Sequence, residues 1–183
     1  MPPLRKTSIW SRLKRDRRGA SAVEFALIAP LMLTFYFGLT ELCQAMLADR
    51  RAGHVASAVG DLVTQADELT TADITDIFNI GRTILTPFPS DTLQMRTSHL
   101  TANAQNVPLV DWSRGYGGMA ARAKNSTVTV NVPITAGQSV VITELEYQYD
   151  SLFGYFVPDG ITYVKKTELR PRFSKTICTA PCT

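Results

Sequence analysis

The feature that most constrains this chain is an apolar segment near its amino terminus. Residues 25–40 are sixteen residues without a formal charge, and residues 20–40 contain a single charged residue, Glu24. As an α-helix the longer segment reaches about 31 Å, close to the thickness of the hydrocarbon core of a bilayer. The pattern therefore predicts one membrane-spanning helix. A carboxylate inside such a helix is costly without a partner, so Glu24 is a candidate functional residue and an amine is its expected partner.

The residues before this segment are strongly basic. Residues 1–19 contain seven Lys or Arg residues and one acid, Asp16, whereas the whole chain carries a net charge of only +3. The positive charge is therefore a targeting feature, and the remainder of the chain, which is net negative, gives no reason to expect nucleic-acid binding. By the positive-inside rule, the amino terminus is cytoplasmic and the residues after the span are extracytoplasmic.

Three kinds of targeting segment share these properties. A removable secretory signal fits the small residues at Cys43-Gln44-Ala45, but the helical pattern continues through that point. A twin-arginine signal fits Arg17-Arg18 but not the Gly-Ala-Ser sequence that follows. An uncleaved signal anchor fits the span and its basic flank, but it explains neither Glu24 nor Gly19.

Cleavage after Gly19 explains both residues. It makes Ala20 the new terminal residue, and Glu24 then lies four residues along, on the same helical face. There the carboxylate neutralises the new amine, or the amine of a neighbouring subunit, which offsets the cost of desolvating both charges. Glycine suits a cleavage site because its missing Cβ lets a protease approach an extended backbone closely.

The same residues resemble a known family. Gly19 followed by Glu24 and Phe25 as the fifth and sixth residues is similar to the processing site of type IV prepilins. The segment Val23–Leu27 together with Pro30 resembles the TadE-like pseudopilins of tight-adherence (Tad) pili. Shorter similarities follow in the order that this family shows, at Asp111-Trp112-Ser113-Arg114, Val132-Pro133, residues 144–149, Phe153-Gly154 and Arg170-Pro171-Arg172.

The resemblance implies processing and partners. It implies cleavage between Gly19 and Ala20, and release, by a prepilin peptidase, an aspartic protease of the bacterial inner membrane. It makes Glu24, Phe25 and Pro30 the processing and assembly motif. The implied partners are that peptidase, the lipid bilayer, other pilins or pseudopilins, and the inner-membrane platform that assembles the pilus.

The resemblance also implies a role. At 183 residues the chain is longer than a major Tad pilin, which favours a minor pseudopilin required for assembly of the pili that serve adhesion and biofilm formation. The expected location is the inner membrane, with a single pass and a periplasmic carboxy-terminal domain. The alternative function is that of an uncleaved single-span anchor, which holds an extracytoplasmic binding or adhesion domain.

Beyond the span the pattern changes from helix to strand. Apolar residues recur at helical spacing over residues 55–66, so one helix is expected from Ala20 to about Asp67. A second helix is expected to begin at Thr70 or Thr71 and to end before Pro87. Strands are expected near residues 93–97, 107–112, 128–132, 139–149 and 162–173.

These elements predict an α+β protein. A long membrane-spanning helix is followed by a small extracytoplasmic antiparallel sheet domain with a packing helix. The expected organisation is a basic leader (1–19), the long helix (20–67) and the α+β domain (68–183). Tyr147 and Tyr149 alternate on one strand with Leu145 and are expected in its core.

The cysteines and histidines predict little chemistry. An oxidising periplasm permits a small disulfide between Cys178 and Cys182, whereas a zinc site lacks ligands because the two histidines, His54 and His99, lie far away in sequence. Cys43 is expected to be a small membrane-facing residue. With no nucleophile elbow, phosphate-binding glycine loop or metal-ligand cluster, we expect no catalytic residues, no metal and no cofactor, and we do not expect an enzyme.

Overall fold

A computed structural model describes residues 18–151, 154, 158–173 and 177–178. The chain divides into two compact units, Met1–Leu42 and Cys43–Thr183. The basic residues 1–17 of the predicted leader lie outside the described residues. The predicted α+β fold, with a long apolar helix, a four-stranded antiparallel sheet and a second helix, is confirmed.

The long helix α2 runs from Arg18 to Gln65 and contributes to both units. It begins two residues before the predicted start and ends two residues before the predicted end, Asp67. From Cys43 onward it buries one stripe of small and β-branched side chains, whose members recur three or four residues apart. These buried residues are Ala45, Ala48, Ala52, Val55, Ala56, Val59 and Val63. The predicted apolar stripe is therefore a core surface.

Helix α3 spans Thr71–Leu85 and begins at the predicted position because its first turn is capped by side chains. The Thr70 hydroxyl accepts a hydrogen bond from the backbone N–H of Asp73 at 3.2 Å. In return, the Asp73 carboxylate accepts one from the backbone N–H of Thr70 at 2.8 Å. This capping box satisfies two backbone donors that an uncapped helix leaves unpaired.

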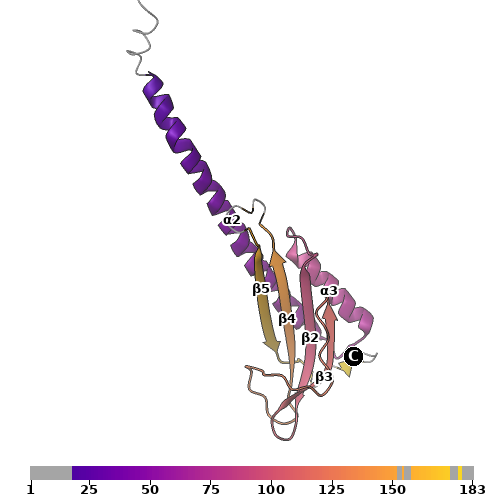
Figure 1. The fold of residues 1–183 in the computed structure, drawn as a ribbon. Coiled ribbons are helices and arrows are strands. Elements are labelled where there is room, and N and C mark those ends of the chain that lie inside the picture. Colours follow the sequence, from indigo (N-terminus) through magenta and orange to yellow (C-terminus); the bar gives the residue numbers. More distant parts are fainter. Residues whose placement is uncertain (1–17, 152–153, 155–157, 174–176, 179–183) are drawn as a thin grey trace, which may run out of the picture. The chain divides into compact units, whose positions relative to one another are not determined.

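Four strands form one antiparallel sheet: β2 (Leu93–Ala102), β3 (Pro108–Tyr116), β4 (Ser139–Tyr149) and β5 (Ile161–Leu169). Their order is β3-β2-β4-β5, and Figure 1 shows them side by side. A separate parallel pair joins β1 (Glu68–Leu69), just after α2, to β6 (Ile177–Cys178). The pairing of β2 with β3 shifts register at His99/Leu100, a β-bulge that leaves Asp111 as the extra residue.

The predicted strand at residues 128–132 is wrong. Only an isolated bridge, between Leu109 and Thr127, lies in this region. Instead of joining a sheet edge, the alternating valines pack on the sheet face turned away from the helices. Val128 is buried there in a cluster with Leu100, Val110, Val140 and Ile142, and Val130 and Val132 pack against it. Alternation correctly indicated which side chains are buried, but it does not report where the backbone bonds: the N–H groups of Asn131 and Val132 donate to the Glu168 carboxylate at 2.7 and 2.9 Å.

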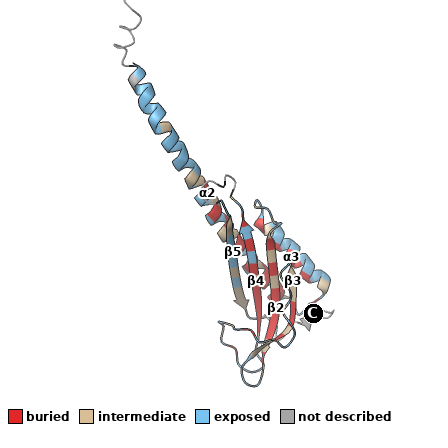
Figure 2. Ribbon diagram, in the orientation of Figure 1, coloured by how far each residue is buried: buried red, intermediate tan, exposed pale blue. Residues whose placement is uncertain are grey.

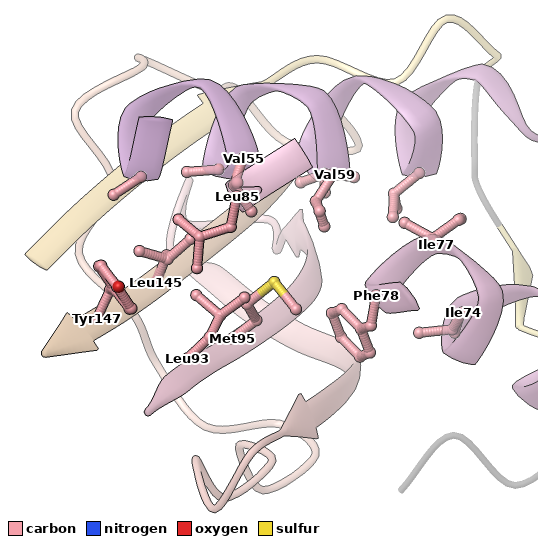
Figure 3. Packing of buried hydrophobic residues seen from close by; sticks show 14 of the residues in the cluster. Val55, Val59, Ile74, Ile77, Phe78, Leu85, Leu93, Met95, Leu145 and Tyr147 are labelled. Atoms are coloured by element: carbon pink, nitrogen blue, oxygen red, sulfur yellow. The ribbon is translucent and has the colours of Figure 1, made fainter. Parts of the chain in front are cut away.

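The main core lies between the helices and the other face of the sheet (Figure 3). Val55 and Val59 of α2 and Ile77 and Phe78 of α3 belong to the same cluster as the sheet residues Leu93, Met95, Leu145, Tyr147 and Tyr149. The core position predicted for Tyr147 and Tyr149 is confirmed, since 1% and 3% of their surfaces are exposed.

Two glycines allow the close approach of these layers. A Cβ on Gly81 of α3 would lie 3.0 Å from Val59 Cγ2, 3.2 Å from Met95 Sδ and 3.3 Å from Val55 Cγ1. A Cβ on Gly60 of α2 would lie 3.0 Å from Thr143 Oγ1 of β4. Gly81 is thus the point where α2, α3 and β2 meet, and the packing there has no room for a side chain.

This contact predicts a strong effect of substitution at Gly81. We expect Gly81→Leu to lower the free energy of unfolding by about 1–3 kcal/mol, because overpacking displaces Val55, Val59 and Met95. The measurement is denaturant unfolding of the detergent-solubilised chain, followed by near-ultraviolet circular dichroism. Gly53→Ala is the control, because a Cβ there meets nothing within 4 Å. Replacing this helical glycine should raise stability by about 0.5–1 kcal/mol. Equal stability of the two variants would contradict the packing described.

Candidate functional site

The first unit presents the candidate site, which is the amino-terminal half of α2. Its sequence is rich in Ala and Leu, which favour helix. Pro30 lies inside this helix and lacks the N–H that would bond the carbonyl of Ala26. The hydroxyls of Thr34 and Thr40 donate to the carbonyls of Pro30 and Tyr36, each at 2.9 Å. Polar side chains that bond within their own helix suit a surface without water.

This half of the helix is exposed (Figure 2), and its exposed side chains are mostly apolar. Phe25 is 72% exposed and Leu27 74% exposed. The other large exposed apolar residues up to Thr40 are Val23, Ile28, Leu31, Met32, Leu33, Phe35, Tyr36, Phe37 and Leu39. The helix is long and apolar enough to cross a membrane, and its most apolar window has no buried residue. Such a surface requires lipid or other chains to cover it, and it is the surface of a single-pass membrane anchor.

Glu24 is exposed on this helix and is the one charged residue between Gly19 and Thr40. It lies in the second turn of α2, close to the end where backbone N–H groups have no helical acceptor. A helix amino terminus carries partial positive charge, so a carboxylate is favourable there. If the chain began at Ala20, that charge would include a full amine, one helical turn from Glu24.

Gly19 lies in the first turn of α2 and is exposed. A Cβ built there meets nothing within 4 Å. The fold therefore does not itself require glycine at this position, in contrast to Gly81. The first turn also has few helical hydrogen bonds to break, so an extended backbone at Gly19-Ala20 costs little.

The structure places the other predicted site residues as follows. Phe25 and Pro30 lie in the exposed half of α2. Cys43 is a free, exposed cysteine. Cys178 ends β6, whereas Cys182 lies outside the described residues, so the disulfide between them remains a prediction.

Sequence reasoning missed a polar cluster on the sheet face turned away from the helices. Glu144 of β4 accepts from Arg96 at 2.8 Å and from Arg122 at 2.7 Å. Burial raises the pKa of the Glu144 carboxyl, but the hydrogen bonds and charges of the two arginines outweigh it, so this pKa lies below its ordinary value. The pairing of Arg96 with Glu144 depends on the register of β2 and β4, and no local signal in the sequence reports that register.

His99 is also held by tertiary structure. Its ring is fully buried and stacks on Trp112, with ring centroids 6.1 Å apart. Its Nδ1 atom lies 2.8 Å from the Asp111 carboxylate at the bulge. Within the described part of the chain, Nε2 has no hydrogen-bond partner. A ring sealed in this way has no access to a substrate. No group of three or more potential metal ligands occurs among the described residues.

The geometry thus defines a membrane-anchored protein whose apolar amino-terminal helix leads into a small α+β domain. Residues 19–61 match the family model described as TadE-like protein. The resemblance of this segment to TadE-like proteins is therefore confirmed. Comparisons with curated proteins and with solved structures gave no match.

The Glu144 cluster predicts a pH-dependent stability. A carboxyl whose pKa is lowered by folding contributes stability above its unfolded pKa and loses it as the pH falls through the folded pKa. We expect Glu144→Gln to lower the free energy of unfolding by about 1–3 kcal/mol at neutral pH, because two charged donors lose their acceptor. The difference should shrink as the pH falls below the ordinary value of 4.5.

Denaturant unfolding at a series of pH values measures this difference. Glu146→Gln is the matched control, because Glu146 is exposed two residues further along the same strand. That variant should match the parent protein throughout. A Glu144→Gln penalty that is independent of pH would show that the carboxylate charge is not the cause.

Proposed function

We propose that this protein is a minor pseudopilin that is cleaved after Gly19 and is required for assembly of Tad-type pili. The observation that carries the proposal is the combination of an exposed Gly19, where a Cβ would meet nothing within 4 Å, with Glu24 one turn beyond Ala20 on an exposed apolar helix. The family match supports it, because the matched residues 19–61 include Gly19, Glu24 and Pro30.

In this proposal Glu24 acts after cleavage. The peptidase frees the amine of Ala20, and the Glu24 carboxylate pairs with that amine or with the amine of an adjacent subunit. Because neither charge can be left alone in lipid, the pair favours subunits in matched axial positions. Phe25 and the neighbouring apolar side chains then exchange lipid for contacts with other pilins or pseudopilins.

The proposed topology follows from charge. The basic leader remains cytoplasmic, where the peptidase and the assembly platform act, and the α+β domain is periplasmic. The protein begins as a single-pass protein of the bacterial inner membrane. Pro30 supports departure from the membrane, because a proline in a helix permits local repacking when its neighbours change.

The alternative function is that of an uncleaved anchor holding an extracytoplasmic binding or adhesion domain. The exposed apolar helix fits both functions. The anchor gives no role to Glu24 or to the glycine at position 19.

Processing distinguishes the two functions. We expect the chain extracted from membranes to begin at Ala20 in cells that contain the prepilin peptidase, and at Met1 in cells that lack it. Intact mass and amino-terminal sequencing measure this directly. A chain that begins at Met1 in both strains would leave the anchor as the function.

Assembly is tested in a deletion strain. Pili should be absent, return with the parent gene, and stay absent with Glu24→Ala. Ser21→Ala is the control, since Ser21 is exposed in the neighbouring turn and carries no charge. Normal piliation of the deletion strain would contradict the assembly role.

A further inference from the structure

The exposed apolar surface of α2 continues past the predicted span. Leu42 is 56%, Met46 52% and Leu47 41% exposed, whereas Ala45 and Ala48 in the same region are buried. From Val23 to Leu47 the helix rises about 36 Å, about one turn more than the roughly 30 Å hydrocarbon core. The turn that carries Met46 and Leu47 is therefore apolar on one side, packed on the other, and located at the end of the span.

Positive charge follows this turn along the same helical face. Arg50 is exposed and lies four residues after Met46, so the two side chains occupy neighbouring positions on the surface. The nearest acid, Asp49, is paired with Lys165 at 2.6 Å. A long basic side chain one turn beyond an apolar surface extends its charge toward the phosphate groups of the lipid headgroups, while its aliphatic stem stays in the apolar layer.

Strand β5 is bonded to the other side of this turn by a hydrogen bond and a salt bridge. The Tyr163 hydroxyl donates to the carbonyl of Ala45 at 2.8 Å. The salt bridge between Lys165 and Asp49 lies one helical turn further. Strand β5 and the exposed side chains of Met46 and Leu47 lie on opposite sides of α2. Since a helix is about 10 Å wide with its side chains, a lipid surface that contacts Met46 and Leu47 is about 10 Å from the start of β5.

We propose that residues 46–50 of α2 form a lipid-docking turn, with Met46 and Leu47 in the interfacial layer of the bilayer and Arg50 at anionic phospholipid headgroups. The two arguments for lipid are continuity with the membrane span along one helix and the charge of Arg50. The inference rests on the proposed membrane insertion of α2. It adds that strand β5 is attached directly to this turn, through the contacts of Tyr163 and Lys165 with α2.

The depth of this turn is measurable in the full chain. The three cysteines are replaced by serine, and single cysteines are introduced by Met46→Cys, Ser57→Cys and Leu31→Cys for spin labelling in phosphatidylcholine/phosphatidylglycerol vesicles. Ser57 is exposed on α2 beyond Arg50 and serves as the control in water. We expect the label at position 46 to collide several-fold less with a water-soluble nickel complex, and more with oxygen, than the label at position 57.

The three label positions distinguish failure of the lipid-docking turn from failure of membrane insertion. Equal nickel accessibility at positions 46 and 57, with position 31 protected, would overturn the lipid-docking turn and leave the membrane span intact. Nickel accessibility at position 31 would instead show that the proposed membrane insertion has failed. Protection at position 46 from both nickel and oxygen, with spin coupling between labelled chains, would identify a second copy of the chain as the occupant and overturn the lipid assignment.

Arg50 is tested by charge reversal. We expect Arg50→Glu to raise nickel accessibility at position 46 in vesicles that contain phosphatidylglycerol and to have little effect in phosphatidylcholine alone. Arg82→Glu is the matched control, because Arg82 is an exposed arginine on α3, where its Nε donates to Ser90 Oγ at 3.3 Å. Equal effects of the two reversals would overturn the role of Arg50 at the headgroups.

Discussion

The packing of α2 against α3 and β2 around Gly81 is the contact on which the second unit depends. Val55, Val59 and Met95 all approach Gly81 closely, because this residue has no side chain to keep them away. This close approach places the stripe of α2 over the helix-facing side of β2 and β4, where Leu145 and Tyr147 complete the core. The sheet is thus covered on one face by helices. On its other face, the segment between β3 and β4 packs Val128 against Leu100, Val110, Val140 and Ile142. On the same face, Arg96 and Arg122 form salt bridges with Glu144.

One helix serves two different surroundings, and its side chains show where they change. Up to Thr40, large apolar residues are exposed and Glu24 is the single charge. From Ala45 onward, one side is buried in the domain by small residues that let strands approach closely. The proposed processing site, the proposed lipid-docking turn and the domain core therefore follow one another along a single element. Substitutions in α2 should separate by position into effects on processing, membrane depth and stability.

The candidate site was predictable because it is linear. Gly19, Ala20, Glu24, Phe25 and Pro30 lie within one short segment, and their spacing on a helix follows from its geometry alone. Most of the fold was also predictable: α3 begins at Thr71, as predicted, and β4 occupies the predicted residues 139–149. The strand expected at residues 128–132 was wrong because alternation reports which side chains are buried, not whether a neighbouring strand offers hydrogen bonds. The pairs His99 with Asp111 and Arg96 with Glu144 depend on strand register and a bulge.

The sequence by itself determined the long helix, the lone carboxylate in its apolar residues 20–40, the basic leader and the α+β class, because local charge, periodicity and capping act over a few residues. Only the tertiary structure decided which polar groups are paired, which glycine permits close packing, and which side of α2 stays apolar and exposed beyond the span. Those properties arise from contacts between residues far apart in the chain. The hydrogen bond from Tyr163 to Ala45 and the salt bridge between Lys165 and Asp49 are such contacts, since they join strand β5 to residues of α2 more than a hundred positions earlier.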